Sequence, residues 1–168
     1  LYTSEIGEKS TEREVRQKWD QIKAREREHK SGKNRIPSLM DDIPLALPSI
    51  SRAVKLQKRA AGAGFDWSES QEVMAKLNEE LSELEAAVSA NDPIQKEHER
   101  GDLFFTVINL ARHLGIEPES ALRKANRSFE ERFRFIEDCL GQQQKIQDCT
   151  LDELNALWDR AKRREQAD

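Results

Sequence analysis

Residues 70–114 read SQEVMAKLNEELSELEAAVSANDPIQKEHERGDLFFTVINLARHL, and this stretch decides the fold class. Its first half repeats apolar residues every three or four positions, which is the spacing of one face of an α-helix. That stripe consists of Val73, Leu77, Leu81, Leu84 and Val88. After the helix-breaking segment 91–93, a second stripe follows on Leu103, Val107, Leu110, Ala111 and Leu114. The stretch therefore predicts two consecutive amphipathic helices.

The remainder of the chain continues the helical pattern. Helical spacing predicts further helices over about 50–61 and 118–140, and a short one after residue 150. Two helix starts carry the pattern of a capping box, in which the first and fourth residues bond to each other's backbone. These boxes pair Ser68 with Gln71 and Thr150 with Glu153. Gly (7) and Pro (5) are few, and the alternation typical of strands is missing. We predict an all-α helical bundle.

The first 48 residues differ in pattern from the rest of the chain. Residues 11–30 predict a helix whose apolar stripe is too narrow to hold a domain together. That stripe consists of Val15, Trp19 and Ile22. Three of the five prolines follow within residues 30–49, as is typical of a linker. We predict a helix and a Pro-containing linker over 1–48, and one compact domain over 49–168.

Composition excludes several classes of function. The net charge is −4 and both signs are mixed along the chain, so no basic face for a nucleic acid is expected. No apolar run approaches the roughly 18 residues that cross a bilayer, and no signal-peptide pattern opens the sequence. Cys139 and Cys149 are too few for a disulfide framework. We expect a cytoplasmic protein with two free thiols that binds neither nucleic acid nor membrane.

Acidic residues border both apolar stripes of the opening stretch. Glu80 and Glu83 lie at the edge of the first stripe, and Glu99 and Asp102 lie three residues apart beside the second. If the two helices pack as an antiparallel pair, these four carboxylates converge. Clustered carboxylates repel one another unless a cation lies among them.

An all-oxygen ligand set suits Mg²⁺ or Mn²⁺ rather than zinc. Mg²⁺ usually takes only a few carboxylates and completes its shell with water and substrate phosphates, so the pattern points to a phosphorylated substrate. Acids make up 32 of 168 residues. One such half-motif alone would therefore most simply be a solvated helix face, whereas two on consecutive helices form a more specific signal.

The two half-motifs also carry a family resemblance. The sequence reads EELSE at 79–83, ERGD at 99–102 and NLARHLG at 109–115. With these motifs the chain closely resembles the MazG family of nucleoside triphosphate pyrophosphohydrolases over residues 64–137, and more weakly elsewhere. The resemblance implies an all-α bundle completed by dimerisation. It also implies that the chain is the second, catalytic domain of a tandem pair, which residues 1–48 would join to the first.

The resemblance implies a reaction and roles for individual residues. A (deoxy)nucleoside triphosphate would be hydrolysed to the monophosphate and pyrophosphate, by attack of a metal-polarised water at the α-phosphorus. The implied metal ligands are Glu80, Glu83, Glu99 and Asp102. Glu79, the spare acid of the first half-motif, would help to orient the water. Mg²⁺ is the expected cofactor, with Mn²⁺ as an alternative.

Contacts to the nucleotide are expected from three further residues. Lys76 lies one helical turn before Glu80 and can reach a phosphate, although a lone lysine is as often solvated. Arg132 matches a family position near the triphosphate, with an ion pair to Glu130 or Glu131 on the same helix face as the alternative. Trp158 matches an aromatic residue that contacts the base, although alone it would more often pack in the core. The family commonly has Lys where this chain has Ser128. Either Arg127 supplies that positive charge from a neighbouring direction, or phosphate binding is weaker in this chain. His98 and His113 lack metal-ligand spacing and are interpreted as structural or solvated residues.

The sequence leaves two alternative functions open. A non-catalytic helical module for dimerisation or partner docking would keep the apolar stripes but would be indifferent to Mg²⁺. A related all-α hydrolase could act on a narrower substrate such as dUTP or dCTP, although the run at 109–115 favours the broader family. A homodimer is implied by the resemblance, and the phenylalanines at 104, 105, 129, 133 and 135 suit a core or a subunit interface.

Overall fold

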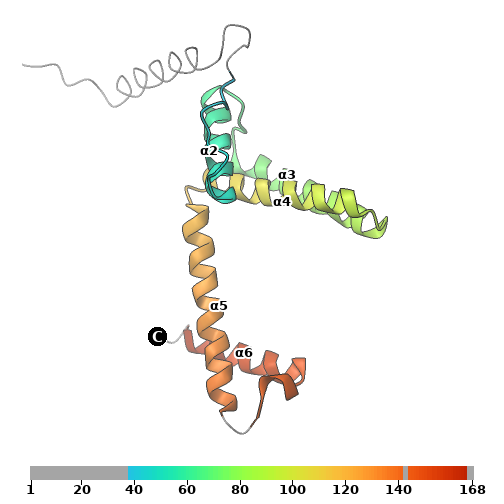
Figure 1. Cartoon of the computed structure of the whole chain (residues 1–168), viewed down its shortest axis with the longest axis vertical. Helices are drawn as coiled ribbons and strands as arrows, with labels where there is room; N and C mark the ends of the chain where they lie inside the picture. Colours follow the sequence, from blue (N-terminus) through green and yellow to red (C-terminus); the bar gives the residue numbers. More distant parts are fainter. Residues whose placement is uncertain (1–37, 142–143, 166–168) are drawn as a thin grey trace, which may run out of the picture. The chain divides into compact units, whose positions relative to one another are not determined.

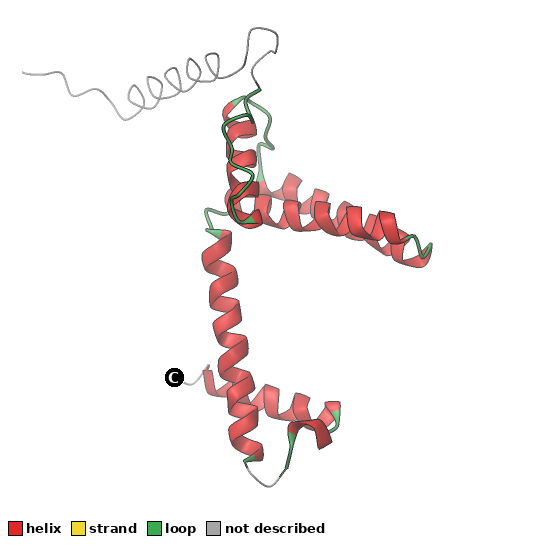
Figure 2. Ribbon diagram, viewed as in Figure 1, coloured by secondary structure: helices red, strands yellow, loops and turns green. Residues whose placement is uncertain are grey.

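The computed structural model describes residues 38–141 and 144–165, and all regular structure in these residues is helical (Figures 1 and 2). The helices are α2 (Ser49–Gly62), α3 (Ser70–Ser89), α4 (Pro93–His113), α5 (Pro118–Leu140), the 3₁₀ turn η1 (Ile146–Asp148) and α6 (Leu151–Glu165). The predicted all-α class is thereby confirmed. None of these helices is both long and apolar enough to cross a membrane. The helix predicted at 11–30 lies outside the described residues.

The chain divides into two compact units, residues 1–68 and 69–168. In the described part of the first unit, α2 holds the segment that precedes it through Arg59. The Arg59 guanidinium donates hydrogen bonds to the Leu39 carbonyl at 2.7 Å and to the Asp42 carboxylate at 2.8 Å. The second unit contains α3 to α6. The domain boundary expected at residues 48–49 stays a prediction.

Helices α3 and α4 pack side by side along their length as a hairpin (Figure 1). The buried residues of α3 recur at a seven-residue spacing, which returns to nearly the same side of a helix after two turns. Those residues are Val73, Glu80 and Ala87, and their counterparts on α4 are Glu99, Thr106 and Asn109. The contact between the two helices is therefore partly polar, and two glutamates lie within it.

The predicted apolar stripes are only partly buried. Four of their members are about half exposed: Leu81 (45%), Val88 (56%), Val107 (47%) and Leu114 (53%). An apolar stripe at helical spacing normally faces the core, but these four positions do not. In a two-helix pair each helix has one neighbour, so the contact covers one narrow line of residues, and the flanking apolar positions stay open.

The ends of the helices follow local sequence signals. The capping box expected at Thr150 and Glu153 is confirmed, because the Glu153 carboxylate accepts from the Thr150 backbone at 2.8 Å and Thr150 Oγ1 accepts from the Glu153 backbone at 3.3 Å. The box expected at Ser68 is one residue out of place. Helix α3 instead begins after Glu69, whose backbone N–H donates to the Glu72 carboxylate at 3.1 Å.

Helices α5 and α6 form a second packed pair within the same unit. Ile136 of α5 and Ala161 of α6 are buried in it. The ring of Phe129 lies 6.1 Å from that of Phe133 and 5.2 Å from that of Trp158, between centroids. Ile136 is the buried residue of α5, and Phe129 remains 57% exposed.

Candidate functional site

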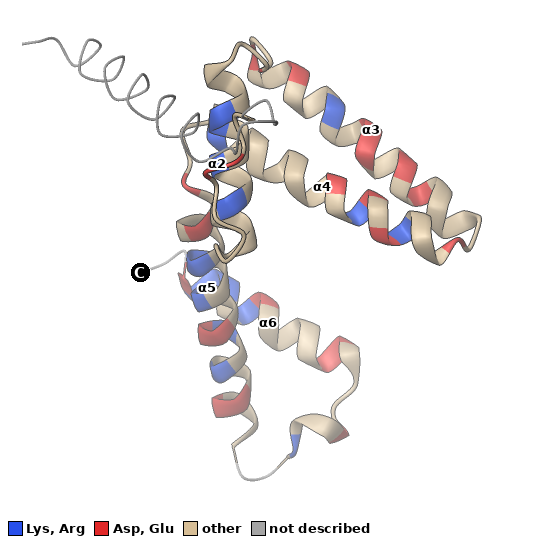
Figure 3. Cartoon of the chain, turned by 45° about the horizontal axis from the view of Figure 1, so that its top comes forward, with Lys and Arg blue, Asp and Glu red and all other residues tan. Residues whose placement is uncertain are grey.

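The hairpin of α3 and α4 brings predicted metal ligands together. Carboxylate oxygens of Glu80, Glu83 and Glu99 all lie within 4.8 Å of one another. Glu80 and Glu99 are each only 5% exposed because they occupy the line of contact between the helices, whereas Glu83 is exposed. Acidic residues accordingly mark both helices in Figure 3. Asp102, the fourth predicted ligand, shares a second such group with Glu99 but is not grouped with Glu80 or Glu83. We call Glu80, Glu83, Glu99 and Asp102 the acidic cluster.

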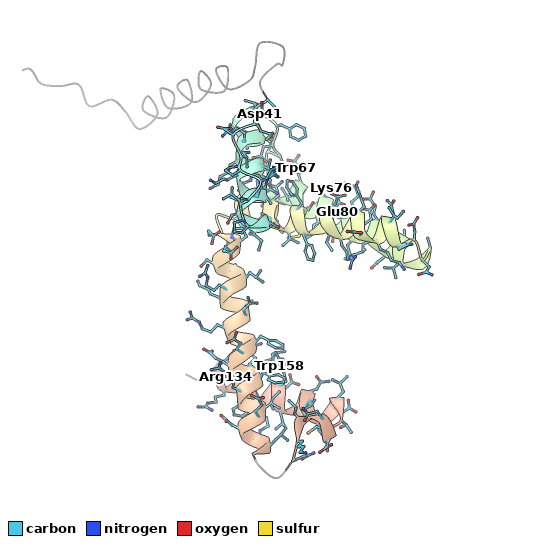
Figure 4. The ribbon with its side chains drawn as sticks, viewed as in Figure 1. Asp41, Trp67, Lys76, Glu80, Arg134 and Trp158 are labelled. Atoms are coloured by element: carbon cyan, nitrogen blue, oxygen red, sulfur yellow. The ribbon has the colours of Figure 1, made fainter. Side chains whose placement is uncertain are left out.

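Lys76 partly neutralises the α3 side of this cluster. Its Nζ lies 2.8 Å from Glu79 Oε1 and 2.9 Å from Glu80 Oε1, and Lys76 and Glu80 are neighbours on α3 in Figure 4. These hydrogen bonds, first to Glu79 and then to Glu80, raise the pKa of Lys76. The other oxygen, Glu80 Oε2, is buried and has no hydrogen-bond partner among the described residues. A buried carboxylate oxygen without a partner is costly unless something binds it.

The α4 side of the cluster contains two residues that sequence reasoning did not assign to it. Gln95 Nε2 donates a hydrogen bond to Glu99 Oε1. His98 Nδ1 lies 3.0 Å from Asp102 Oδ2 and 3.7 Å from Glu99 Oε1. Gln95 and Glu99 are four residues apart, and so are His98 and Asp102. This i, i+4 spacing places two side chains on the same side of a helix, so the sequence contained a signal for both contacts.

The electrostatics of the cluster fit a divalent cation. The pKa of Glu83 is raised, chiefly by loss of surrounding solvent, and further by the negative charges of Glu80 and Glu99, while Lys76 opposes the rise. Three mutually close carboxylates with one nearby ammonium leave an excess of negative charge. An oxygen-rich set of this kind suits Mg²⁺ or Mn²⁺, and Glu80 Oε2, which has no partner within the described ranges, is available as a ligand.

Arg132 and Trp158 are brought together by α5 and α6. The Arg132 guanidinium lies 5.3 Å from the centre of the Trp158 ring, and it donates to the Glu165 carboxylate from Nε at 3.1 Å and from Nη2 at 2.7 Å. These contacts raise the pKa of Arg132 and lower that of Glu165. The ion pair therefore crosses to α6 instead of joining Arg132 to Glu130 or Glu131.

A cavity of about 340 Å³ adjoins this pair of helices. Its lining residues are Glu131, Arg132, Arg134, Phe135, Asp138, Ala161, Arg164 and Glu165. Arg164 lies over the Phe135 ring at 5.7 Å from its centre.

In the described part of the chain, neither Arg132 nor Trp158 contacts the acidic cluster, so the predicted site residues form two separate groups in one protomer. Ser128, one turn before Arg132, is half-buried.

Comparison with known proteins gives one family match and several relatives. The family model described as phosphoribosyl-ATP pyrophosphohydrolase matches residues 48–129, which contain the whole acidic cluster. The chain is 42% identical over 155 residues to the nucleoside triphosphate pyrophosphohydrolase of Escherichia coli K12, covering 90% of this chain and 57% of that protein. It is 39% identical over 145 residues to the nucleoside triphosphate pyrophosphohydrolase/pyrophosphatase MazG of Thermotoga maritima, covering 86% and 54%.

A third relative places the same segment in a longer protein. The chain is 36% identical over 156 residues to the uncharacterized protein YabN of Bacillus subtilis, covering 92% of this chain and 31% of that protein. The chain thus spans just over half the length of the first two relatives and about a third of this one.

Proposed function

Because this chain belongs to the MazG family of nucleoside triphosphate pyrophosphohydrolases, we propose that it hydrolyses nucleoside triphosphates to monophosphates and pyrophosphate. One observation carries the proposal. Three carboxylates of two helices meet within 4.8 Å, and the buried oxygen Glu80 Oε2 has no partner among the described residues. If the helix pair served only to stabilise the fold, an apolar residue in place of Glu80 would make it more stable.

The acidic cluster would hold the cation through Glu80 and Glu83 from α3 and through Glu99 and Asp102 from α4. A bound Mg²⁺ or Mn²⁺ would offset the negative charge of the triphosphate and lower the pKa of the attacking water. Gln95 fixes the rotamer of Glu99 by its hydrogen bond, so this carboxylate is held in place before any ligand arrives.

Other residues of the chain would orient the substrate. Lys76, already within 2.9 Å of Glu80, supplies a positive charge beside the cluster that can move to a phosphate oxygen. Glu79 is exposed next to Lys76 and would orient the attacking water and accept its proton. Because Arg132 and Trp158 do not contact the acidic cluster within the described part of one chain, they would reach its substrate from a second copy. There Arg132 would bind a phosphate with the fork that now holds Glu165, and Trp158 would stack on the base.

The substrate is defined by the bond that is cleaved rather than by the base. The names of the matching family and of the Escherichia coli and Thermotoga maritima relatives share the word pyrophosphohydrolase, which describes release of pyrophosphate by hydrolysis. Nucleoside triphosphates are the first candidates, because both named relatives carry that substrate in their names. Phosphoribosyl-ATP is a second candidate, favoured by the match over residues 48–129.

A substrate panel tests this proposal. We expect the purified chain to release monophosphate and pyrophosphate in equal amounts from at least one ribo- or deoxyribonucleoside triphosphate or from phosphoribosyl-ATP. Turnover should require Mg²⁺ or Mn²⁺ and should stop when the ion is chelated. The products are separated by ion-exchange chromatography. If the well-folded protein turns over none of these substrates with either ion, the proposal that the chain is an enzyme is wrong, and a non-catalytic helical docking module is favoured.

We further propose that the chain acts as a homodimer through the uncovered face of the α3–α4 hairpin. Met74, Leu81 and Val88 follow one another at seven-residue spacing on α3 and are each about half exposed. On α4, Phe104 is 67% exposed and Val107 is 47% exposed. Apolar side chains that line up on one face usually mark an interaction surface. A second copy of the same hairpin would cover them and complete a four-helix bundle.

The dimer predicts a clear effect of one substitution. Phe104→Glu places a charge on the uncovered face, so the chain is expected to elute as a monomer of 19.4 kDa, while the unchanged chain elutes at twice that mass. Light scattering coupled to size exclusion measures the mass. Ala86→Glu, which introduces the same side chain on the exposed polar side of α3, should leave the dimer intact. A monomeric unchanged chain would contradict the proposal.

A further inference from the structure

His98 is the residue at the acidic cluster for which the proposed function has no role. It lies on α4 immediately before Glu99 and one turn before Asp102. Its Nδ1 is 3.0 Å from Asp102 Oδ2 and 3.7 Å from Glu99 Oε1. The imidazole is therefore directed along the helix toward the same carboxylates that would hold the cation.

The positions of these three side chains fit a shared cation. One ring nitrogen of His98 and one oxygen each of Glu99 and Asp102 all lie within 4.8 Å of one another. His98 and Asp102 have the i, i+4 spacing, which lets two side chains of a helix reach one ion. The His98 side chain is 70% exposed, so packing of the hairpin does not explain its position.

A second observation points to a ligand at this place. Glu99 belongs both to the group with His98 and Asp102 and to the group with Glu80 and Glu83. In the latter group Glu80 is only 5% exposed, and its Oε2 has no hydrogen-bond partner among the described residues. Glu99 thus belongs to two groups that together include four other side chains from the two helices. One of these four, Glu80, has a buried oxygen without a hydrogen-bond partner among the described residues.

We propose that His98, through Nδ1, is a nitrogen ligand of the cation held at Glu99 and Asp102, so that this centre binds ions with affinity for nitrogen more strongly than an all-oxygen centre would. The inference rests on the proposed metal-dependent function. Mg²⁺ takes oxygen ligands almost exclusively, whereas imidazole suits the later divalent ions of the first transition row. Among these, Co²⁺ is a suitable probe because it is bound more strongly than Mn²⁺ by mixed nitrogen and oxygen ligands.

The simpler alternative is an ordinary helix-surface pair between His98 and Asp102. Such exposed pairs contribute little to stability and bind no ion. The two interpretations predict different effects of removing the ring. Loss of a metal ligand weakens binding of Co²⁺ selectively, whereas loss of a surface pair leaves the affinity for every ion unchanged.

The test measures Co²⁺ and Mg²⁺ binding to the nucleotide-free chain by isothermal titration calorimetry. We expect His98→Gln to weaken Co²⁺ binding on the order of 10- to 100-fold and to change Mg²⁺ binding less than about 3-fold. In the Co²⁺ form of the unchanged chain, the ring protons of His98 should show large paramagnetic NMR shifts that vanish in the variant. His113→Gln, a histidine substitution on the same helix outside the cluster, should alter neither affinity.

The possible results separate this inference from the proposed function. Unchanged Co²⁺ affinity in His98→Gln, together with Mg²⁺-dependent pyrophosphate release, would overturn only the role of His98. Loss of Co²⁺ affinity in that variant, without turnover of any triphosphate by the unchanged chain, would support the ligand and overturn the proposed reaction. Failure of the unchanged chain to bind Co²⁺ would overturn the inference outright.

Discussion

Replacing Glu80 with glutamine is expected to lower Mg²⁺-dependent pyrophosphate release by on the order of 10³-fold, which corresponds to about 4 kcal/mol of transition-state stabilisation. Glutamine keeps the size of the side chain and can still accept a hydrogen bond from Lys76. It removes the negative charge from the one oxygen of the cluster that is buried without a partner among the described residues. The variant therefore isolates the charge of Glu80 from its packing.

The same substitution should abolish stabilisation by the ion. A ligand present at 100 times its Kd stabilises the folded state by about 2.7 kcal/mol. For a chain of this length that corresponds to a rise in Tm of roughly 5–10 °C. We expect the unchanged chain to show such a rise with Mg²⁺ in differential scanning calorimetry, and Glu80→Gln to show none. Because glutamine fits the same space, the Tm values measured without the ion should be similar.

Glu85→Gln is the matched control for this experiment. Glu85 is an exposed acid of the same helix outside the acidic cluster. The Glu85→Gln substitution removes one negative charge from α3, as Glu80→Gln does. It therefore measures the effect of net charge alone, and turnover should stay within about 2-fold of the unchanged chain. If Glu80→Gln and Glu85→Gln reduced turnover equally, the acidic cluster would have no special part in the reaction.

Replacing Arg132 with alanine is expected to raise KM for the triphosphate roughly 10- to 100-fold, with a smaller change in kcat. A hydrogen bond between charged groups contributes about 1.5–3 kcal/mol to binding. Loss of that free energy corresponds to the expected rise in KM. The guanidinium already holds a carboxylate through two nitrogens, at 3.1 and 2.7 Å, and lies over Trp158. A phosphate can take the place of Glu165 in the same fork. Because Ser128, one turn earlier, provides no charge, binding should depend strongly on Arg132.

Steady-state kinetics over a range of triphosphate concentrations separates KM from kcat in this variant. Arg123→Ala provides the control, since Arg123 is a 72% exposed arginine of the same helix whose pair with Glu119 is long, at 3.9 Å. It should leave both constants unchanged. An unaltered KM in Arg132→Ala would mean that Arg132 serves only to attach α6 to α5 through Glu165.

The helices themselves follow from local sequence. Proline and glycine positions, apolar spacing and the capping box at Thr150 and Glu153 predict the elements within a few residues, because these signals act between neighbours along the chain. The identity of the acidic cluster was also predictable. The two half-motifs have the one-turn spacing that sets two carboxylates on one side of a helix, and their pairing on consecutive helices required only that the two helices form a hairpin.

Tertiary structure decided which of these side chains are buried and which partners they meet. The spacing of apolar residues locates the apolar side of a helix only to within one position. It therefore could not predict that Glu80 and Glu99 are buried in the contact between α3 and α4 while Leu81 and Val88 are about half exposed. The pairing of Arg132 with Glu165 joins residues 33 positions apart, and no local signal marks such a pair. These outcomes depend on how the surfaces of neighbouring helices fit together. The pattern of a single helix does not contain that information, because it is a property of two surfaces in contact.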